Sequence, residues 1–278
     1  MAVQTTIRHP GPKLTEKKQR SGTLKSLALF IAPLAACAVL AELLVRIGLL
    51  DERLTPAPST VFTRMVELAG PTGNYLLWAN LGTSASRVLP ALLIAAVLGI
   101  AVGIALGLSR KASDYLSPLL GFMLPLPAVA WTPVFVVSIG RGYTTMLIVL
   151  VLGAVFPILY NVKSGVEGIT ERQIWAMRSL GGTKLDVLFR VILPAAWPAI
   201  LNGLRLGMGH AWRTLVAVEL LTSATLGLGA LIFNSRSSLD TPTMYVSILV
   251  IAVAGLLIDH TFFRYWESRT VGKWGESQ

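Results

Sequence analysis

Long apolar runs constrain this chain more than any other feature of its sequence. The hydrocarbon core of a bilayer, ~30 Å thick, is crossed by a helix of about 20 apolar residues, and only helices or closed barrels satisfy their backbone groups there. The run from Val88 to Leu108 contains no charged residue. The sequence holds runs of this kind at Leu24–Leu50, Arg87–Leu108, Tyr115–Ile139, Gly142–Val162, Ala195–Leu221 and Thr241–Phe263. They predict an all-α transmembrane protein with six spans.

Composition excludes the other broad classes. The chain is 54% hydrophobic and 14% charged, whereas a soluble domain is about 45–50% apolar and about 25% charged. Disorder requires low hydrophobicity and is excluded as well. The net charge of +10 does not indicate a nucleic-acid partner, because most Lys and Arg lie between the apolar runs rather than on one face. The single cysteine, Cys37, and three scattered histidines predict neither a disulfide nor a metal site.

Charge placement predicts the domain organisation and the orientation. Lys and Arg are concentrated in the segments that lie on one side of the six spans, and positive segments stay inside. Both termini are therefore expected in the cytoplasm of a multi-pass protein of the inner (plasma) membrane. The predicted parts are a basic head at 1–25 that contacts anionic lipid, a permease domain at 26–266 with a cytoplasmic loop at 163–194, and a tail at 267–278.

The chain carries no motif for chemistry of its own. A Gly-rich phosphate loop ending in Gly-Lys-Ser/Thr is missing, and so are Gly-x-Ser-x-Gly and His-Glu-x-x-His. We therefore predict that it is not an enzyme and needs no cofactor within this chain. The energy for any transport must come from another polypeptide or from an ion gradient.

Glycines spaced four apart mark two predicted helix faces. Gly99, Gly103 and Gly107 fall on one face of the second run, and Gly203 and Gly207 repeat the spacing in the fifth. Such faces let a second backbone approach closely. The pattern fits an interface inside a moving bundle and fits static packing equally well.

Prolines crowd the third run, at Pro118, Pro125, Pro127 and Pro133. Each removes a backbone donor, and broken helices of this kind often border a translocation pathway. A kinked packing helix is the alternative interpretation.

Ionisable residues inside a span are expensive and usually face a cavity or a partner. Arg213 and Glu219 lie six residues apart in the fifth run, too far around a helix to pair easily. Arg213 is a candidate contact for an anionic substrate, with Trp212 as an aromatic wall; an interhelical ion pair is the alternative. Glu42 and Arg46 are four apart and predict a local ion pair.

The loop at 163–194 carries a family resemblance. It reads Trp175-Ala176-Met177-Arg178-Ser179-Leu180-Gly181, then nine residues, then Val191-Ile192-Leu193-Pro194. This is similar to the EAA loop of binding-protein-dependent ABC importer permeases, and within them it resembles the nitrate/sulfonate/taurine branch. The similarity runs from about Leu54 to Glu267. Its other matching residues are Ser84, Arg87, Gly107–Arg110, Pro127, Ala130, Trp131, Pro133, Gly140, Gly142, Phe156–Ile158, Gly203–Arg205 and Val218-Glu219.

The resemblance implies a six-helix type I importer permease that works as a homodimer. Its partners would be two ABC ATPase subunits, which bind ATP and Mg, and a solute-binding protein. A short amphipathic helix at Glu171–Leu180, ended by Gly181-Gly182, would insert into the ATPase. The predicted coupling residues are Trp175, Ala176, Met177, Arg178, Gly181 and Pro194. The predicted pathway residues are Trp131, Trp212, Arg213 and Glu219.

Departures from the branch add positive charge. Trp175 replaces the acidic first position of the signature and Met177 its second alanine, so an apolar contact is expected at the ATPase. Arg141 stands where the branch usually has an apolar residue, and Arg213 where it usually has a small or uncharged one. Both changes favour an anionic substrate.

Two rival functions remain open at this stage. An ion-gradient-driven secondary transporter would need no ATPase, but deeper paired carboxylates or an inverted repeat would be expected. A membrane scaffold whose loop recruits a partner would carry no solute.

Overall fold

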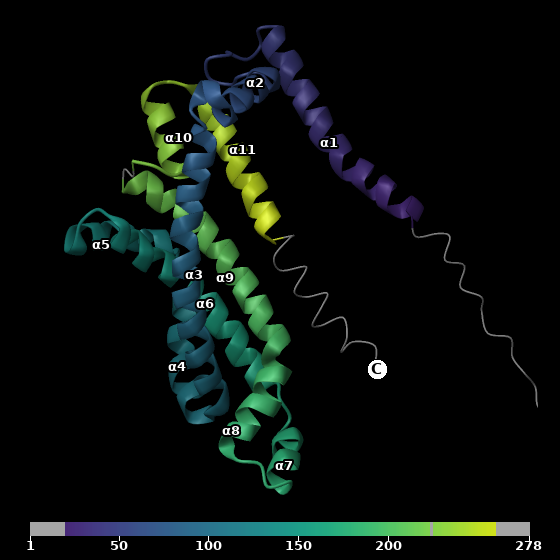
Figure 1. Cartoon of the computed structure of the whole chain (residues 1–278), viewed down its shortest axis with the longest axis vertical. Coiled ribbons are helices and arrows are strands. Elements are labelled where there is room, and N and C mark those ends of the chain that lie inside the picture. The colour runs from purple at the N-terminus through teal and green to yellow at the C-terminus, as the bar shows by residue number, and fades with distance from the viewer. Residues whose placement is uncertain (1–19, 223–224, 260–278) are drawn as a thin grey trace, which may run out of the picture. The chain divides into compact units, whose positions relative to one another are not determined.

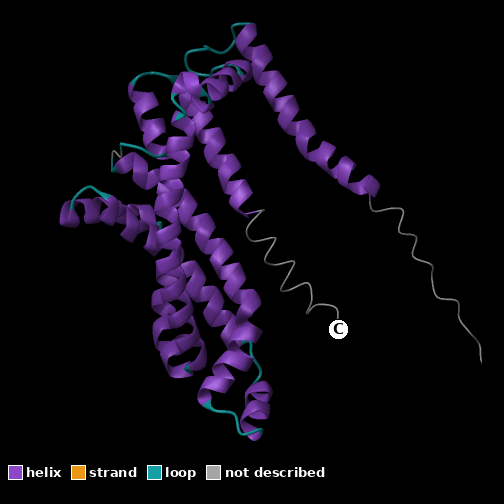
Figure 2. Ribbon diagram, viewed as in Figure 1, coloured by secondary structure: helices purple, strands orange, loops and turns teal. Residues whose placement is uncertain are grey.

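The computed structural model describes residues 20–222 and 225–259, with side chains from residue 32 onward. The described chain consists of helices and connecting loops and contains no strand (Figure 2). It divides into two compact units, residues 1–60 and 61–278. In chain order (Figure 1) the elements are α1 (Arg20–Arg46), α2 (Pro58–Ala69), η2 (Pro71–Gly73), α3 (Leu76–Leu108), α4 (Arg110–Met123), η3 (Ala128–Trp131), α5 (Thr132–Ile139), α6 (Tyr143–Glu167), α7 (Glu171–Ser179), α8 (Lys184–Val187), the π-helix η4 (Leu188–Ile192), α9 (Leu193–Leu221), α10 (Leu228–Ser237) and α11 (Thr241–Leu257).

The first unit contains the predicted ion pair at the end of α1. Arg46 Nη2 lies 2.7 Å from Glu42 Oε1, which confirms the pair. The Glu42 carboxylate also accepts hydrogen bonds from the backbone N–H and the hydroxyl of Ser59, at 3.1 and 2.8 Å. These bonds join the end of α1 to the chain that follows it.

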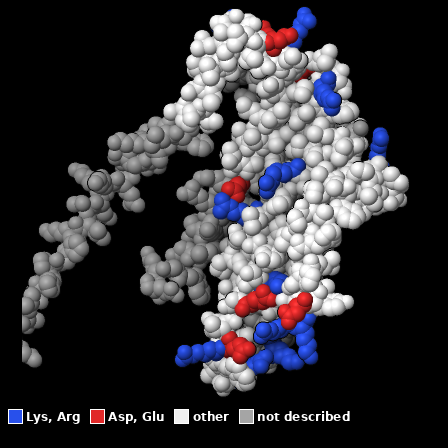
Figure 3. Space-filling model, turned by 180° about the vertical axis from the view of Figure 1, so that it is seen from behind, with Lys and Arg blue, Asp and Glu red and all other residues white. Residues whose placement is uncertain are grey.

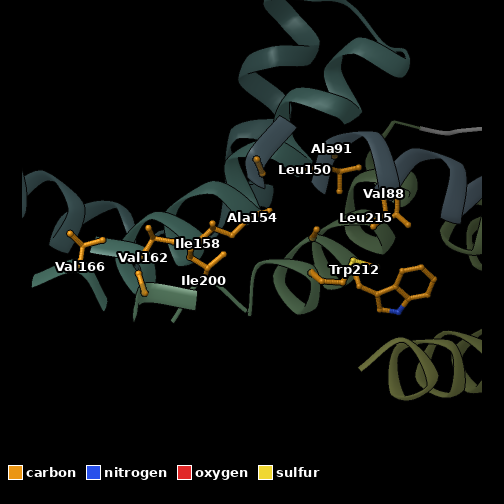
Figure 4. Packing of buried hydrophobic residues seen from close by; sticks show 14 of the residues in the cluster. Val88, Ala91, Leu150, Ala154, Ile158, Val162, Val166, Ile200, Trp212 and Leu215 are labelled. Carbon is orange, nitrogen blue, oxygen red and sulfur yellow. The ribbon is translucent and has the colours of Figure 1, made fainter. Parts of the chain in front are cut away.

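The second unit is built around α3, α6 and α9. Its main apolar cluster runs the length of α6, through Leu150, Ala154, Ile158, Val162 and Val166 (Figure 4). Residues of α3 such as Val88 and Ala91, and residues of α9 such as Ile200 and Leu215, belong to the same cluster. The three helices therefore share one continuous core.

Both glycine faces pack on α6, which confirms the predicted interface. A Cβ at Gly103 would lie 2.8 Å from Val162 Cβ, and one at Gly107 would lie 2.6 Å from Val166 Cβ. Ile158 is enclosed on two sides: a Cβ at Gly99 of α3 would lie 2.8 Å from its Cγ2, and one at Gly207 of α9 would lie 2.7 Å from its Cγ1. Backbone groups thus approach α6 where any larger residue would collide.

The helix that contains the second apolar run is longer than predicted. α3 begins at Leu76, so three turns over residues 76–86 precede the predicted run, which starts at Arg87. These turns contain the polar residues Asn80 and Ser84, and both are buried and hydrogen-bonded to other elements. Hydropathy could not anticipate that partnership, because the partners lie more than 140 residues further along the chain.

The third apolar run is broken rather than continuous. α4 and the η3–α5 segment meet at an angle of 84° around residues 124–127, where Pro125 and Pro127 remove backbone donors. Among the described residues, three helices are long and apolar enough to cross a membrane, or four if this bent pair is one span. α11 is a shorter apolar helix as far as it is described. The count of six spans stays a prediction.

An ion pair joins α2 to the start of α11. Arg64 Nη2 lies 2.8 Å from Asp240 Oδ2, and Arg64 Nε donates to the hydroxyl of Thr243. Burial raises the pKa of Asp240, but hydrogen bonds from Thr243 and Arg64 outweigh burial and leave this pKa below its usual value. The carboxylate is therefore charged at neutral pH and caps α11 through the Thr243 N–H.

Candidate functional site

The predicted amphipathic helix in the loop at 163–194 is present as α7. Two hydrogen bonds end it, from Gly182 N to Met177 O at 3.1 Å and from Gly181 N to Arg178 O at 3.0 Å. This is a Schellman ending, which requires a left-handed residue. Gly181 supplies it with φ +81°. At Gly182 a Cβ would lie 2.8 Å from Met177 Cγ. The local geometry therefore explains why glycine occupies both positions.

A second short helix, α8, follows at once and is capped at its N-terminus. Thr183 Oγ1 accepts from Asp186 N, and Asp186 Oδ2 accepts from Thr183 N, which together form a capping box. The π-helix η4 then joins α8 to α9. Pro194, in the first turn of α9, has no N–H to donate, which interrupts the regular hydrogen-bond ladder at this joint.

The predicted coupling residues are distributed over both faces of this segment. Trp175 is 61% exposed, and Ala176, Arg178, Gly181 and Pro194 are exposed as well. Met177 is half-buried and packs on the core beneath Gly182. The exposed large apolar residues of the segment are Trp175, Leu180, Leu185 and Phe189. Charged side chains gather at this end of the molecule, and a smaller group of them lies in the middle of the same face (Figure 3).

Arg213 lines a cavity of about 360 Å³ between α9 and the broken third run. The wall opposite Arg213 is the segment 123–129, which includes Pro125 and Pro127, and α6 contributes Gly153 and Pro157. Arg213 Nε donates to Gly209 O at 2.9 Å. Within the described part of the chain no carboxylate forms an ion pair with Arg213. The prolines and the arginine that the sequence singled out separately therefore border one space.

Trp131 lines a neighbouring apolar cavity of about 220 Å³, together with Phe135 and Phe156. Its ring centroid lies 6.4 Å from that of Phe135. Met123, Leu126, Ala128, Leu152 and Phe156 line both cavities. Trp131 and Arg213 are thus on adjoining spaces.

Trp212 does not form the aromatic wall beside Arg213 that the sequence suggested. Its side chain is 5% exposed and belongs to the apolar core (Figure 4). The indole Nε1 donates to Ile251 O of α11 at 3.1 Å, and a Cβ at Gly255 would lie 3.2 Å from its Cδ1. Successive residues of a helix point in directions about 100° apart, so Trp212 packs against α11 while Arg213 lines the cavity.

Glu219 is likewise enclosed rather than facing a cavity. It is 0% exposed, and its carboxylate accepts from Arg87 Nη1 at 2.6 Å, from the Ser84 hydroxyl at 3.0 Å and from Gly229 N at 2.9 Å. The Ser84 oxygen also accepts from Leu228 N. A Cβ at Gly227 would collide with the Glu219 carboxylate.

This buried cluster fastens the start of α10 to α3 and α9. Arg87 Nη1 also donates to Leu226 O at 2.7 Å, and Asn80 Oδ1 accepts from Gly227 N at 2.7 Å. Sequence reasoning named Ser84, Arg87 and Glu219 as matching residues of one family but did not pair them, because they lie more than 130 residues apart. An arginine at the start of the second run and an acid in the fifth run were the available signal.

The described residues offer no obvious place for a metal. Over 20–222 and 225–259, no group of three or more His, Cys, Asp or Glu side chains is placed to hold an ion. The cavities beside the broken run and the α7–α8 segment are the candidate functional features.

Apolar spanning helices, a proline-broken segment at a cavity and a helical segment at one end define a polytopic membrane permease. Residues 95–269 match the family described as "Binding-protein-dependent transport system inner membrane component". The chain belongs to this family, whose members are the permease components of ABC transporters. It is a multi-pass membrane protein of the type I ABC permease fold.

Two relatives within the family are named for the transport of small solutes that carry an oxyanion group. The chain is 35% identical over 237 residues to the taurine transport system permease protein TauC of Escherichia coli, covering 84% of this chain and 86% of TauC. It is 32% identical over 225 residues to the bicarbonate transport system permease protein CmpB of Synechococcus elongatus, covering 78% and 80%. These similarities place the chain in the nitrate/sulfonate/taurine branch that its sequence resembled.

Proposed function

We propose that this chain is the membrane-spanning subunit of an ATP-driven importer for a small anion of the sulfonate, taurine or nitrate kind. A solute-binding protein outside the membrane delivers the anion, and the chain moves it into the cytoplasm. The observation that carries the proposal is Arg213, an exposed guanidinium without a carboxylate partner in the described chain, which lines the open cavity between α9 and the broken third run. An unpaired charge within a membrane-spanning helix is expensive unless a ligand or a partner uses it.

The α7–α8 segment is the proposed contact with the ATPase. Its exposed apolar side chains, Trp175, Leu180, Leu185 and Phe189, need a partner surface, and two capped ends hold their helices in fixed positions. In this scheme ATP and Mg bind on the ATPase, and its closure moves the segment as a lever. η4 and Pro194 carry that motion into α9.

The assembly is proposed to contain two copies of this chain, two ATPase subunits and one binding protein.

The position of α7 relative to α6 gives the proposed orientation. α7 begins four residues after α6 ends, so the α7–α8 segment and the first turn of α6 lie at opposite ends of α6. With the segment in the cytoplasm, the start of α6 faces outward and both termini of the chain are cytoplasmic.

Purification from the native membrane tests the assembly first. The chain is extracted in a gentle detergent and the co-eluting proteins are identified by mass spectrometry. We expect an ATPase at equal stoichiometry and a trace of solute-binding protein. Recovery of the chain alone, even after mild cross-linking, would instead favour a secondary transporter.

Uptake by the recovered complex tests the substrate class. The complex is reconstituted in liposomes with its binding protein, and ATP is enclosed. Labelled taurine, methanesulfonate, nitrate and bicarbonate are compared with glycine betaine and glucose. We expect ATP-dependent uptake of at least one of the first four solutes, each of which carries a sulfonate or another oxyanion group, and of neither glycine betaine nor glucose. Transport of only glycine betaine or glucose would refute the proposed substrate class.

A further inference from the structure

A third cavity, separate from those of Arg213 and Trp131, opens at the first turn of α6. Its volume is about 380 Å³, within the range of ligand sites, ~300–1,000 Å³. Its lining residues are Arg87, Arg141, Gly142, Tyr143, Met146, Thr222 and Thr225. None of them lines the Arg213 cavity. Two guanidinium groups and three hydroxyl-bearing side chains thus surround one space.

The charge of this cavity is positive. Arg87 is neutralised by Glu219, which lies on its buried side and is itself 0% exposed. Arg141 is exposed and has no ion-pair partner in the described chain. The space therefore faces one balanced and one unbalanced guanidinium, without a carboxylate in its lining.

The Arg87 side is held rigidly before any ligand arrives. Arg87 Nη1 donates to both Glu219 and Leu226 O, and the Arg87 side chain is 13% exposed. Its remaining N–H donors are not needed by Glu219. A fixed guanidinium with free donors is the usual protein group for an oxyanion, since its planar fork matches two oxygens.

The two cavities follow one another along the same pair of helices. Thr222 lies nine residues beyond Arg213 on α9, which corresponds to about 13 Å along the helix axis. α6 also lines both cavities: Met146 lies at the Arg87–Arg141 cavity, and Gly153 and Pro157 lie at the Arg213 cavity. Arg141 and Arg213 are thus arranged in series.

We propose that the Arg87–Arg141 cavity is a second binding station, which takes a small oxyanion at the end of the bundle opposite α7–α8. It receives the anion before the Arg213 cavity does, and Arg141 sets its preference for negative charge. The inference rests on the proposed function, because it assumes that the transported solute is an anion.

Charge-selective thiol labelling tests the station without knowledge of the natural solute. Cys37→Ala removes the only cysteine, and Thr225→Cys adds a thiol to the cavity lining. The full complex in nanodiscs of zwitterionic lipid is treated with 2-sulfonatoethyl methanethiosulfonate, itself a sulfonate, or with the trimethylammonium analogue. We expect the ratio of the two rates to favour the sulfonate, and Arg141→Gln to lower that ratio by about threefold or more at low salt.

A matched control separates the cavity from general surface charge. Arg236→Gln removes an exposed arginine on α10 that does not line the cavity, and it should leave the ratio unchanged. An equal ratio with and without Arg141 would overturn the proposal. Protection of the thiol by millimolar methanesulfonate, lost in Arg141→Gln, would support it. Slower labelling only in phosphatidylglycerol nanodiscs would assign the cavity to a lipid headgroup and overturn it as well.

Uptake kinetics keep this inference distinct from the proposed function. If an anion is imported and Arg141→Gln raises KM several-fold while kcat changes little, the station is supported. If an anion is imported and neither parameter changes, the station fails and the proposed function stands. If no anion is imported by the unmodified complex, the proposed function fails and the station loses its role in transport.

Discussion

At the scale of single residues, two charged side chains of α9 have opposite surroundings. Arg213 borders a cavity and lacks a carboxylate in the described chain, whereas Glu219 is completely enclosed by donors. They lie six residues apart, yet the surroundings of Arg213 suit a transient ligand, whereas those of Glu219 suit a permanent structural interaction. Their variants should therefore fail in different ways.

Arg213→Ala is expected to lower uptake of the transported anion at least tenfold, because the cavity loses its positive charge. Arg213→Lys keeps the charge and should retain part of the activity. Labelled-anion uptake in proteoliposomes gives the rates, and co-purification of the ATPase controls for assembly. Uptake equal to that of the unmodified chain would assign Arg213 a structural role.

Glu219→Gln is expected to destabilise the fold by about 3–5 kcal/mol, because it leaves the charge of Arg87 without its buried partner. The double variant Arg87→Gln, Glu219→Gln should recover part of that loss. Thermal denaturation in detergent, followed by size-exclusion chromatography, measures both. An unchanged midpoint for the single variant would mean that the Ser84 and Gly229 bonds suffice.

At the scale of elements, glycines on one helix differ in what surrounds them. Gly103→Ala places a Cβ 2.8–2.9 Å from Val162 and Leu159 O, so α3 and α6 must separate at a cost of about 1–3 kcal/mol. Gly82→Ala, on the same helix, meets nothing within 4 Å and should be neutral or slightly stabilising. The fraction that stays monodisperse after heating compares the two. Equal behaviour would contradict the close packing of α3 on α6.

The ending of α7 provides a second test at this scale. Gly181→Val forces a β-branched residue to φ +81° and should disrupt the Schellman ending, with loss of most uptake. Gly181→Asn tolerates that conformation and should keep uptake near normal. Both variants should insert normally, which membrane fractionation checks. If valine is as active as asparagine, the geometry of this ending does not matter for coupling.

At the scale of the whole molecule, the orientation can be tested with the same single-thiol background. In Cys37→Ala, a membrane-impermeant maleimide should label Thr225→Cys in intact spheroplasts and Lys184→Cys only after permeabilisation. This follows from the excess of Lys and Arg at the α7–α8 end. The reverse pattern would invert the proposed direction of transport.

Local sequence patterns predicted much of this architecture, but they could not predict contacts between residues that lie far apart in the sequence. The glycine spacing located the packing faces of α3 and α9, and Gly181-Gly182 located the end of α7, because both are properties of one helix. The start of α3 was placed 11 residues late, since Asn80 and Ser84 are satisfied by residues near 227. Trp212 was assigned to the cavity of Arg213 because adjacency in sequence says little about which way two helical residues point.

The two glycine faces that enclose Ile158 have a mechanical consequence. With backbones of α3 and α9 pressed against α6 on both sides, the three helices have little room to slide past one another, and they form one stiff beam. α6 alone is about 37 Å long. A stiff beam that pivots near its middle moves its ends in opposite directions, so a tilt of about 10° displaces each end by about 3 Å. A displacement of α7 would then move the Arg87–Arg141 cavity in the opposite direction. The three helices would move as one rigid body, so no sequence of side-chain rearrangements would be needed.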